Sequence, residues 1–347
     1  MIEGHGDDLY RYGGKLVNFS SNVYGGINHS GLVAYLANRM EVIRNYPEPE
    51  PKSLEREIER REQLDSGGVC VTNGATEAIY LIAQAMKGSC SAVLQPTFSE
   101  YADAARLHGH QVVSFYTLDV RTIPEKVQVV WICNPNNPTG MVYDKALLAA
   151  CVQKHPHRLF VLDQSYEAFT QRPLFTAAEA AAYPNLLVLH SMTKHYALPG
   201  LRLGYVTGCV SLIDLLRRQR MPWSVNALAV EAGHYLLQHE DEFAIDLPAL
   251  LAEKDRVAEA LRQIGGMEVW PSDTHYLLVQ LRSGTAASLK AYLAEECGML
   301  IRDAANFEGL DAGFFRIAVQ GKKENDDLIA AIKKWIPVGG IKLIKDL

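Results

Sequence analysis

Short apolar runs alternate with helix-like stretches from residue 67 to about residue 207, and this alternation restricts the fold more than any other feature of the chain. It is typical of a mostly parallel β-sheet whose strands are joined by crossover helices. The predicted helices include Ala75–Met86, with apolar residues at helical spacing, and Ser99–Leu107. The sequence therefore predicts one large α/β domain with seven strands. The candidate strands are Gly68–Thr72, Ala92–Gln95, Gln111–Tyr116, Gln128–Cys133, Leu159–Asp163, Leu186–His190 and Arg202–Thr207.

A smaller α+β domain is predicted after Pro222, where long helical periodicity begins. One helix, Leu247–Ile264, ends at a pair of glycines, as a helix C-terminus should. The first 45 residues have little periodicity and predict an arm that joins the small domain and a subunit interface. We therefore expect an arm over residues 1–45, a large domain over 46–245 and a small domain over 246–347. Further elements of the small domain are predicted at Tyr276–Gln280, Leu300–Arg302, Phe314–Val319 and Asn325–Trp335.

Charge and cysteine spacing narrow the class of protein. The net charge is −6, without long runs of either sign, which argues against nucleic acid or an anionic membrane as the main partner. The six cysteines contain no Cys-x-x-Cys pair, so neither a metal site nor a disulfide framework is indicated. The acidic N-terminus does not resemble a signal peptide, and no run approaches the roughly 20 apolar residues of a membrane span. We expect a cytoplasmic protein.

Polar loops follow the first and fourth strands, at the edge where an open α/β sheet binds its ligands. The stretch Asn73-Gly74-Ala75-Thr76-Glu77 is a glycine turn that opens a helix, whose free N–H groups suit a phosphate. A simple capped helix start has the same composition. After the fourth strand, Asn134-Pro135-Asn136-Asn137-Pro138-Thr139-Gly140 predicts a rigid loop that presents amide side chains.

Charged side chains follow the fifth and sixth strands. Asp163 ends the fifth strand and Tyr166 follows three residues later. An acid at the end of a buried strand is costly unless a cation meets it, although a helix-capping aspartate is an equal alternative. A lone lysine is nearly always a solvated charge. Here, however, two hydroxyls, a lysine and an arginine fall within twelve residues: Ser191, Thr193, Lys194 and Arg202.

These loops supply an amine, a carboxylate, a tyrosine, an amide, and a phosphate-binding turn with an arginine. Together these are the groups that hold pyridoxal phosphate. The motifs of the commonest alternative sites are absent or incomplete. Neither a G-x-G-x-x-G fingerprint nor a P-loop occurs. Ser191-Met192-Thr193-Lys194 matches the S-x-x-K pattern of serine acyl-enzymes, but their Ser-Asp-Asn and Lys-Thr-Gly elements are missing. His239-Glu240 begins a zincin-like string in which Phe243 takes the place of the second histidine.

The motifs together resemble those of fold type I pyridoxal-phosphate enzymes. Within the class I/II aminotransferase family, the chain is most similar to the branch with histidinol-phosphate aminotransferases and the threonine-phosphate decarboxylases of cobalamin synthesis. The resemblance runs from His5-Gly6 to the C-terminal helix and is most specific at Asn134 to Gly140, at Asp163 with Tyr166, and at Ser191-x-x-Lys194 with Arg202. It implies a large cofactor-binding domain with a seven-stranded sheet, a smaller α+β domain, and a homodimer with shared active sites.

The resemblance implies a role for each cofactor-binding residue. Lys194 binds pyridoxal phosphate covalently, Asp163 pairs with the ring nitrogen, and Tyr166 contacts the ring hydroxyl; these three are the implied catalytic residues. Asn137 also contacts the hydroxyl, and Tyr101 stacks on the ring. The phosphate is bound by Gly74, Ala75, Thr76, Ser191, Thr193 and Arg202, and by Tyr46 reaching into the neighbouring subunit.

The resemblance also implies substrate contacts. Arg316 clamps a carboxylate and Arg302 serves a second anion, with surface pairing on a strand as the alternative for both arginines. His5, for which a flexible terminal histidine is the alternative, and Asn22 complete the implied set.

Two reactions fit a phosphorylated amino substrate of this kind. Four stretches favour the decarboxylases: His5-Gly6, Asn18 to Asn22, Pro199 before Gly200-Leu201-Arg202, and Leu300 to Leu310. We therefore expect decarboxylation of O-phospho-L-threonine to aminopropanol phosphate. Transamination of histidinol phosphate with 2-oxoglutarate is the alternative. A cofactor-binding relative without catalysis is disfavoured because both Lys194 and Asp163 are present. Gln164 departs from the glutamate expected after the ring aspartate.

Overall fold

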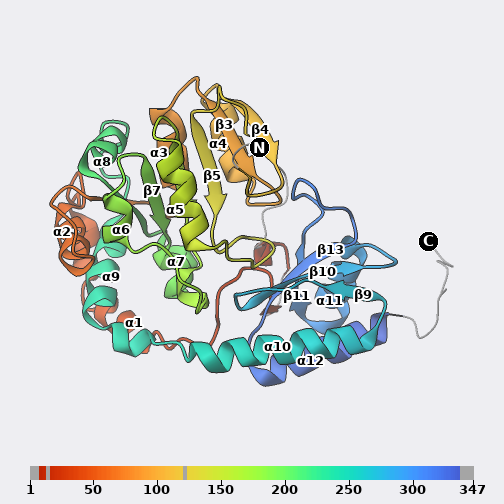
Figure 1. The fold of residues 1–347 in the computed structure, drawn as a ribbon. Coiled ribbons are helices and arrows are strands. Elements are labelled where there is room, and N and C mark those ends of the chain that lie inside the picture. Colours follow the sequence, from red (N-terminus) through yellow and green to blue (C-terminus); the bar gives the residue numbers. More distant parts are fainter. Residues whose placement is uncertain (1–7, 13–15, 120–122, 337–347) are drawn as a thin grey trace. The chain divides into compact units, whose positions relative to one another are not determined.

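The structure, a computed structural model, describes residues 8–12, 16–119 and 123–336 (Figure 1). Its contacts divide the chain into two compact units. The first consists of Ile27–Asn137 and Met141–Ile245; the second contains Pro138–Gly140, the described residues before Ile27 and those from Asp246 onward. Residues 27–45 thus belong to the first unit, whereas the sequence predicts them to be part of an arm.

A seven-stranded sheet forms the centre of the first unit, in the order β2-β8-β7-β6-β5-β3-β4. β8 is antiparallel to both of its neighbours, and every other neighbouring pair is parallel. This confirms the predicted mostly parallel sheet, and the predicted strand bounds are at most two residues from the observed ones. The strands are β2 (Val69–Thr72), β3 (Cys90–Leu94), β4 (Gln111–Phe115), β5 (Val129–Cys133), β6 (Leu159–Asp163), β7 (Leu186–His190) and β8 (Gly204–Gly208).

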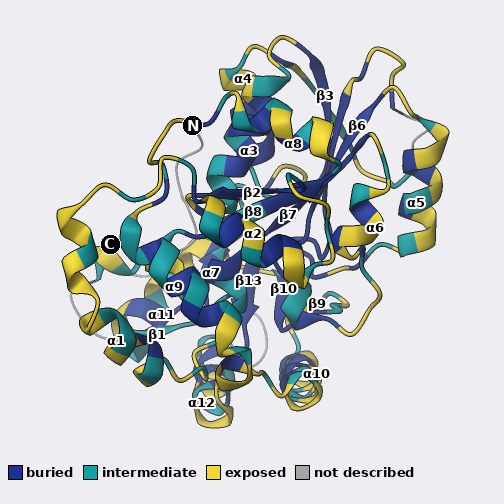
Figure 2. Ribbon diagram, turned by 90° about the vertical axis from the view of Figure 1, so that its left-hand side faces the viewer, coloured by how far each residue is buried: buried dark blue, intermediate teal, exposed yellow. Residues whose placement is uncertain are grey.

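Helices cover both faces of this sheet, so its central strands are buried while the outer faces of the helices are exposed (Figure 2). Along β6, Leu159 and Val161 pack toward α3, α4 and α8, and Phe160 and Leu162 pack toward α5 and α6. Burial on both faces explains why these strands are continuous apolar runs. The helices of the first unit are α1 (Ser30–Ala37), α2 (Lys52–Arg61), α3 (Gly74–Ala85), α4 (Glu100–Leu107), α5 (Lys145–Lys154), α6 (Ala177–Ala181), α7 (Met192–His195), α8 (Val210–Arg217) and α9 (Ala227–Gln238).

The second unit contains a four-stranded antiparallel sheet in the order β12-β13-β10-β9, and β1 pairs with β11 in a separate parallel ladder. The single strand predicted over 300–302 is two strands in the structure, because the chain changes pairing partner at Ile301. The elements are β1 (Val17–Asn18), α10 (Leu247–Ile264), β9 (Met267–Val269), β10 (Tyr276–Leu281), α11 (Ala286–Cys297), β11 (Met299–Leu300), β12 (Arg302–Asp303), β13 (Phe314–Ala318) and α12 (Lys322–Trp335).

The cysteines are all free thiols, and four of them, Cys70, Cys90, Cys133 and Cys151, are buried. Over the described ranges, no helix is both long and apolar enough to cross a bilayer.

Candidate active site

Three loops of the first unit lie at the same edge of the sheet. They follow β2, β6 and β7, which run in the same direction, so their carboxyl ends face the same way. This is the edge at which open α/β sheets bind ligands. The loops carry most of the residues to which the sequence assigns a cofactor-binding role.

Asp163 ends β6 inside the sheet and is only 4% exposed. Its Oδ1 accepts a hydrogen bond from the backbone N–H of Ser165 at 2.8 Å, and its Oδ2 accepts one from the Tyr101 hydroxyl at 2.7 Å. Burial, together with the Asp163 carboxylate, raises the pKa of Tyr101 well above its usual value and the pKa of the Cys133 thiol to about 12. Tyr101 therefore stays protonated and donates to Asp163 throughout the neutral pH range.

The predicted stacking of Tyr101 on the cofactor ring stays a prediction, and the structure shows the contacts that hold this side chain. Its side chain is 1% exposed and stacks on Trp131 at 5.7 Å, with only 19° between the ring planes. Both the ring and the hydroxyl are thus engaged beneath the site. Phe98 lies edge-on to Tyr101 at 5.9 Å and is partly exposed, so it is the more accessible ring of this segment.

Lys194 lies in the short helix α7, which follows β7 directly. Its Nζ is 6.0 Å from the centre of the Tyr166 ring, so these two predicted catalytic side chains are neighbours. In the same turn, the hydroxyls of Ser191 and Thr193 share a hydrogen bond of 2.9 Å, and both residues are buried. The loop after β7 therefore carries one amine next to two hydroxyls that are hydrogen-bonded to each other.

Arg202 adopts a left-handed backbone conformation with φ +57°, which is uncommon for a residue other than glycine. Its Nη1 donates to the carbonyl of Pro199 at 3.1 Å. A Cβ atom on Gly74, whose φ is +77°, would lie 2.5 Å from the Nη2 of Arg202. Glycine thus leaves room for the guanidinium at the N-terminus of α3, beside the first free N–H groups of Ala75 and Thr76. A cation and helix N–H groups together form a cradle for a phosphate.

The loop after β5 is held by two of its asparagines. The Oδ1 of Asn134 accepts from the N–H of Tyr143 at 2.8 Å. Asn136 donates to the carbonyl of Pro96 at 3.0 Å and accepts from the Thr97 hydroxyl at 2.9 Å. This frame fixes the position of the third asparagine, Asn137, which is itself buried.

The second unit brings the two predicted substrate arginines together. Arg302 on β12 and Arg316 on β13 are direct partners across the antiparallel ladder, and both are buried. Arg316 donates to the carbonyl of Ser20, and Arg302 donates to the Oδ1 of Asn306 at 2.8 Å. Burial, and next the neighbouring Arg316, lower the pKa of Arg302 to about 10.

Asn22 lies in the same unit, fully buried, with φ +52°. Within the described part of the chain, neither its side-chain oxygen nor its side-chain nitrogen has a hydrogen-bond partner. Burying an amide without hydrogen-bond partners costs free energy. A ligand that hydrogen-bonds to the amide would offset this cost. His5 lies outside the described residues.

Tyr46 is not gathered with the loop residues. Its side chain is 83% exposed, and its ring lies 5.1 Å from that of Trp223. This exposure leaves open the predicted contact with a neighbouring subunit.

Sequence reasoning missed the residues that hold the loops in place. Gln164 donates to the carbonyl of Phe175 at 2.9 Å and accepts from its N–H at 3.2 Å, a pairing that a glutamate could not make in full. Glu167 pairs with His190 at 3.0 Å. The only signal for the first contact was the departure of Gln164 from the expected glutamate.

Comparisons with known proteins place this site in a family. Residues 14–332 match the family described as aminotransferase class I and II. The chain belongs to this family. The structure of L-threonine-O-3-phosphate decarboxylase from Porphyromonas gingivalis is similar, with a TM-score of 0.90 and 37% identity over 92% of this chain and 99% of that one.

Two curated relatives in the same family have different names. The threonine-phosphate decarboxylase of Salmonella typhimurium is 30% identical over 92% of this chain and 91% of its own. The histidinol-phosphate aminotransferase of Methylibium petroleiphilum is also 30% identical, over 88% of this chain and 85% of its own. The chain is thus similar to a decarboxylase and to an aminotransferase.

Pyridoxal phosphate is the cofactor of this family, and the residues of the first unit fit it. The cradle formed by Gly74 and Arg202 suits the cofactor phosphate. The buried carboxylate of Asp163 suits the ring nitrogen, and Lys194 is the amine that would bind the aldehyde. Tyr166 and Asn137 would hold the ring hydroxyl.

Proposed function

We propose that this chain decarboxylates O-phospho-L-threonine, which yields carbon dioxide and aminopropanol phosphate, a reaction of cobalamin biosynthesis. The 37% identity to L-threonine-O-3-phosphate decarboxylase over nearly the whole chain supports this assignment. The paired arginines of the second unit fit a substrate with two anionic groups.

The pairing of Arg302 with Arg316 is the observation that carries the proposal. Like charges directly opposite each other on neighbouring strands destabilise a sheet, and burial adds to the cost. Such a pair is retained where anions compensate it. O-phosphothreonine carries two anionic groups, a carboxylate and a phosphate, and so provides one for each arginine. Histidinol phosphate carries a phosphate but no carboxylate.

Bound pyridoxal phosphate supplies the electron sink that accepts the electron pair left on Cα when carbon dioxide departs. The chain's own residues would orient and protonate the substrate. Arg302 and Arg316 would hold its acidic groups and Asn22 would donate a hydrogen bond to one of them. The Nζ of Lys194 would deliver a proton to Cα, in place of the carboxylate that has left.

Transamination of histidinol phosphate with 2-oxoglutarate is the second candidate. The aminotransferase of Methylibium petroleiphilum, at the same 30% identity as the Salmonella decarboxylase, is the observation in its favour. 2-Oxoglutarate also carries two anionic groups, so the arginine pair would serve this co-substrate.

Parallel assays on the purified protein loaded with pyridoxal phosphate distinguish these reactions. We expect O-phosphothreonine to release carbon dioxide in amounts equal to the aminopropanol phosphate formed. Histidinol phosphate with 2-oxoglutarate should give no glutamate above background. Glutamate formation without carbon dioxide release would overturn the decarboxylase assignment and favour the second candidate.

We also propose that the chain forms a homodimer in which Tyr46 reaches the cofactor phosphate of the partner subunit. Exposed apolar side chains near Tyr46 support an interface at this surface, since single exposed residues are ordinary but a group of them is not. They are Met40, Ile43, Tyr46, Met221 and Trp223, and their side chains are between 46% and 83% exposed.

A further inference from the structure

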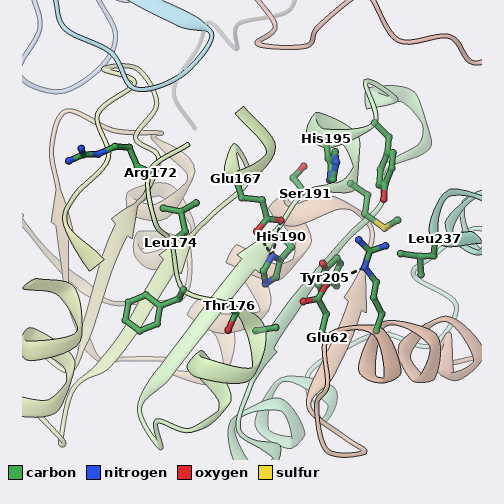
Figure 3. Close-up of a pocket in the computed structure, with 15 residues that line it drawn as sticks. Glu62, Glu167, Arg172, Leu174, Thr176, His190, Ser191, His195, Tyr205 and Leu237 are labelled. Atoms are coloured by element: carbon green, nitrogen blue, oxygen red, sulfur yellow. Dashed lines mark hydrogen bonds and ion pairs between the residues drawn. The ribbon is translucent and has the colours of Figure 1, made fainter. Parts of the chain in front are cut away.

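An ion pair between a buried histidine and a half-buried glutamate lies next to the cofactor-binding loops. The Nδ1 of His190 lies 3.0 Å from both carboxylate oxygens of Glu167 (Figure 3). Its Nε2 lies 3.0 Å from the hydroxyl of Thr207. The imidazole also stacks on Tyr205 at 4.5 Å with 15° between the planes, and His190 is only 4% exposed. One histidine thus connects the loop after β6 to β7 and β8.

The two members of this pair are adjacent in sequence to site residues. Glu167 directly follows Tyr166, and His190 directly precedes Ser191, three residues before Lys194. The backbone supports the same connection, because the N–H of Gln164 donates to the carbonyl of Leu189 at 2.9 Å. A change in the pair would therefore move Tyr166 relative to Ser191 and Lys194.

We propose that Glu167 and His190 act as positioning residues that hold the Tyr166 loop and the Ser191–Lys194 loop at the spacing that pyridoxal phosphate requires. The inference deepens the proposed function and rests on its assignment of both loops to the cofactor. Neither side chain is proposed to touch the cofactor. Their effect is transmitted through the adjacent residues Tyr166 and Ser191.

A cavity of about 340 Å³ gives solvent access to the pair, and the Glu167 side chain is 31% exposed. Burial lowers the pKa of His190, but the Glu167 carboxylate outweighs it and the net pKa is raised. For Glu167, burial raises the pKa, and the His190 imidazolium outweighs it so that the net pKa is lowered. The other titratable or charged groups around the pair are Arg61, Glu62, Asp163, Arg172, His195, Tyr196 and Tyr205.

These directions set a pH window for the pair. The raised pKa of His190 means that its contribution is complete below about pH 6.5 and is lost as pH rises through the folded-state pKa. The lowered pKa of Glu167 means that its contribution is present above about pH 4.5 and is lost as pH falls through the folded-state pKa. Both groups are charged between these limits.

The test measures pyridoxal phosphate binding rather than turnover. We expect Glu167→Gln to raise the dissociation constant of pyridoxal phosphate about tenfold, since the hydrogen bond to His190 loses its charged acceptor. His190→Gln should have a similar effect, and the double variant should be no weaker than either single one, because the two side chains act as a unit. Glu57→Gln is the matched control, because Glu57 also pairs with a histidine, His234, in the same unit.

The wild-type protein provides a second measurement that does not depend on the folding of a variant. Its affinity for pyridoxal phosphate should fall as pH rises through the pKa of His190, and in Glu167→Gln this step should move to lower pH. Additive effects of the two substitutions, or a change in Glu167→Gln no larger than in Glu57→Gln, would overturn the proposal. If the wild type itself bound no pyridoxal phosphate, the site assignment would fail instead.

Discussion

Lys194 is the amine on which the cofactor assignment depends at the scale of single residues. Its Nζ lies near the Tyr166 ring, in a loop whose hydroxyl residues Ser191 and Thr193 are buried. We expect Lys194→Ala to lose the visible absorbance of covalently bound pyridoxal phosphate, while the phosphate cradle at Arg202 still binds the free cofactor. Absorbance spectra after borohydride treatment check this result. Persistent labelling of the variant would show that another amine binds the aldehyde.

Tyr101 should act on the cofactor through Asp163. We expect Tyr101→Phe to keep the ring packed on Trp131 and to leave the Oδ2 of Asp163 without its 2.7 Å donor. A less well-held carboxylate stabilises the protonated ring nitrogen less effectively, so kcat should fall about tenfold with KM nearly unchanged. Steady-state kinetics check the split. A change confined to KM would assign Tyr101 to substrate binding instead.

Arg302 should destabilise the protein in the absence of substrate. Its pKa is about 10 in the folded state, well below the usual value of an arginine, so above about pH 10 the unfolded state binds more protons than the folded state. The stability that the charge costs at pH 7 is therefore regained only as pH rises above 10. We expect Arg302→Met to raise Tm by about 2–4 °C at pH 7, equivalent to about 1 kcal/mol. It should also raise the KM for O-phosphothreonine at least tenfold.

The control for Arg302→Met is Arg282→Met, which removes an exposed arginine from the same unit. Calorimetry at pH 7 and at about pH 11 separates the two variants, because only the Arg302 variant should approach the wild type in Tm above the folded-state pKa of Arg302. A Tm below that of the wild type at both pH values would show that Arg302 stabilises the fold.

The sequence predicted which residue types gather at the sheet edge but not their partners. Asp163 could be found because it ends a recognisable buried strand, and Lys194 because it follows one. The contact of Tyr101 with Asp163 joins residues 62 positions apart, and its hydroxyl gives no periodic signal. The same is true of Glu167 and His190, which are 23 positions apart.

At the scale of elements, those whose ends are marked by local sequence signals could be predicted. The helix α10 was predicted to the residue because Asp246 caps its start, accepting from the N–H of Ala249, and Gly265 with φ +78° ends it. The division of residues 299–303 between β11 and β12 could not be predicted. It depends on pairing with Val17–Asn18, nearly the whole chain length away.

The edge strand β2 pairs only with β8, and side chains take the place of a second neighbour. The carboxylate of Glu55 accepts from the N–H of Val71 at 3.1 Å and from Arg220 at 2.7 Å. Arg217 and Arg220 donate to the carbonyls of Val69 and Val71 at 2.7 and 2.9 Å. These contacts cover an edge that would otherwise be open to another strand.

We expect Glu55→Ala to lower the free energy of unfolding by about 3–5 kcal/mol, because it removes the buried carboxylate that pairs with the buried Arg220. Urea unfolding followed by circular dichroism measures this change, and light scattering reports any pairing of the exposed edge. Asp327→Ala is the control, since its pair with Lys323 is exposed and its loss should barely move the midpoint. Equal effects of the two substitutions would contradict the role given to Glu55.

At the scale of the whole molecule, the exposed Tyr46 allows a direct test of shared sites. Lys194→Ala and Tyr46→Ala should each be nearly inactive as homodimers. In a mixed dimer, the Tyr46→Ala subunit keeps its own Lys194 and receives an intact Tyr46 from its partner, so one of the two sites is complete. Random pairing makes half of the dimers mixed, and activity should recover to about a quarter of the wild-type value.

A second mixture shows whether that recovery comes from sharing. Lys194 and Asp163 belong to the same unit of one chain, so mixing Lys194→Ala with Asp163→Asn leaves every site incomplete. Recovery in the first mixture alone requires that Tyr46 act across the interface. If Tyr46 acted within its own chain instead, activity would recover in neither mixture. The ring of Tyr46 is 83% exposed and contacts Trp223. Different affinity tags on the two variants, with dimers recovered that carry both tags, confirm that subunits have exchanged, so absence of recovery in exchanged dimers contradicts the shared site.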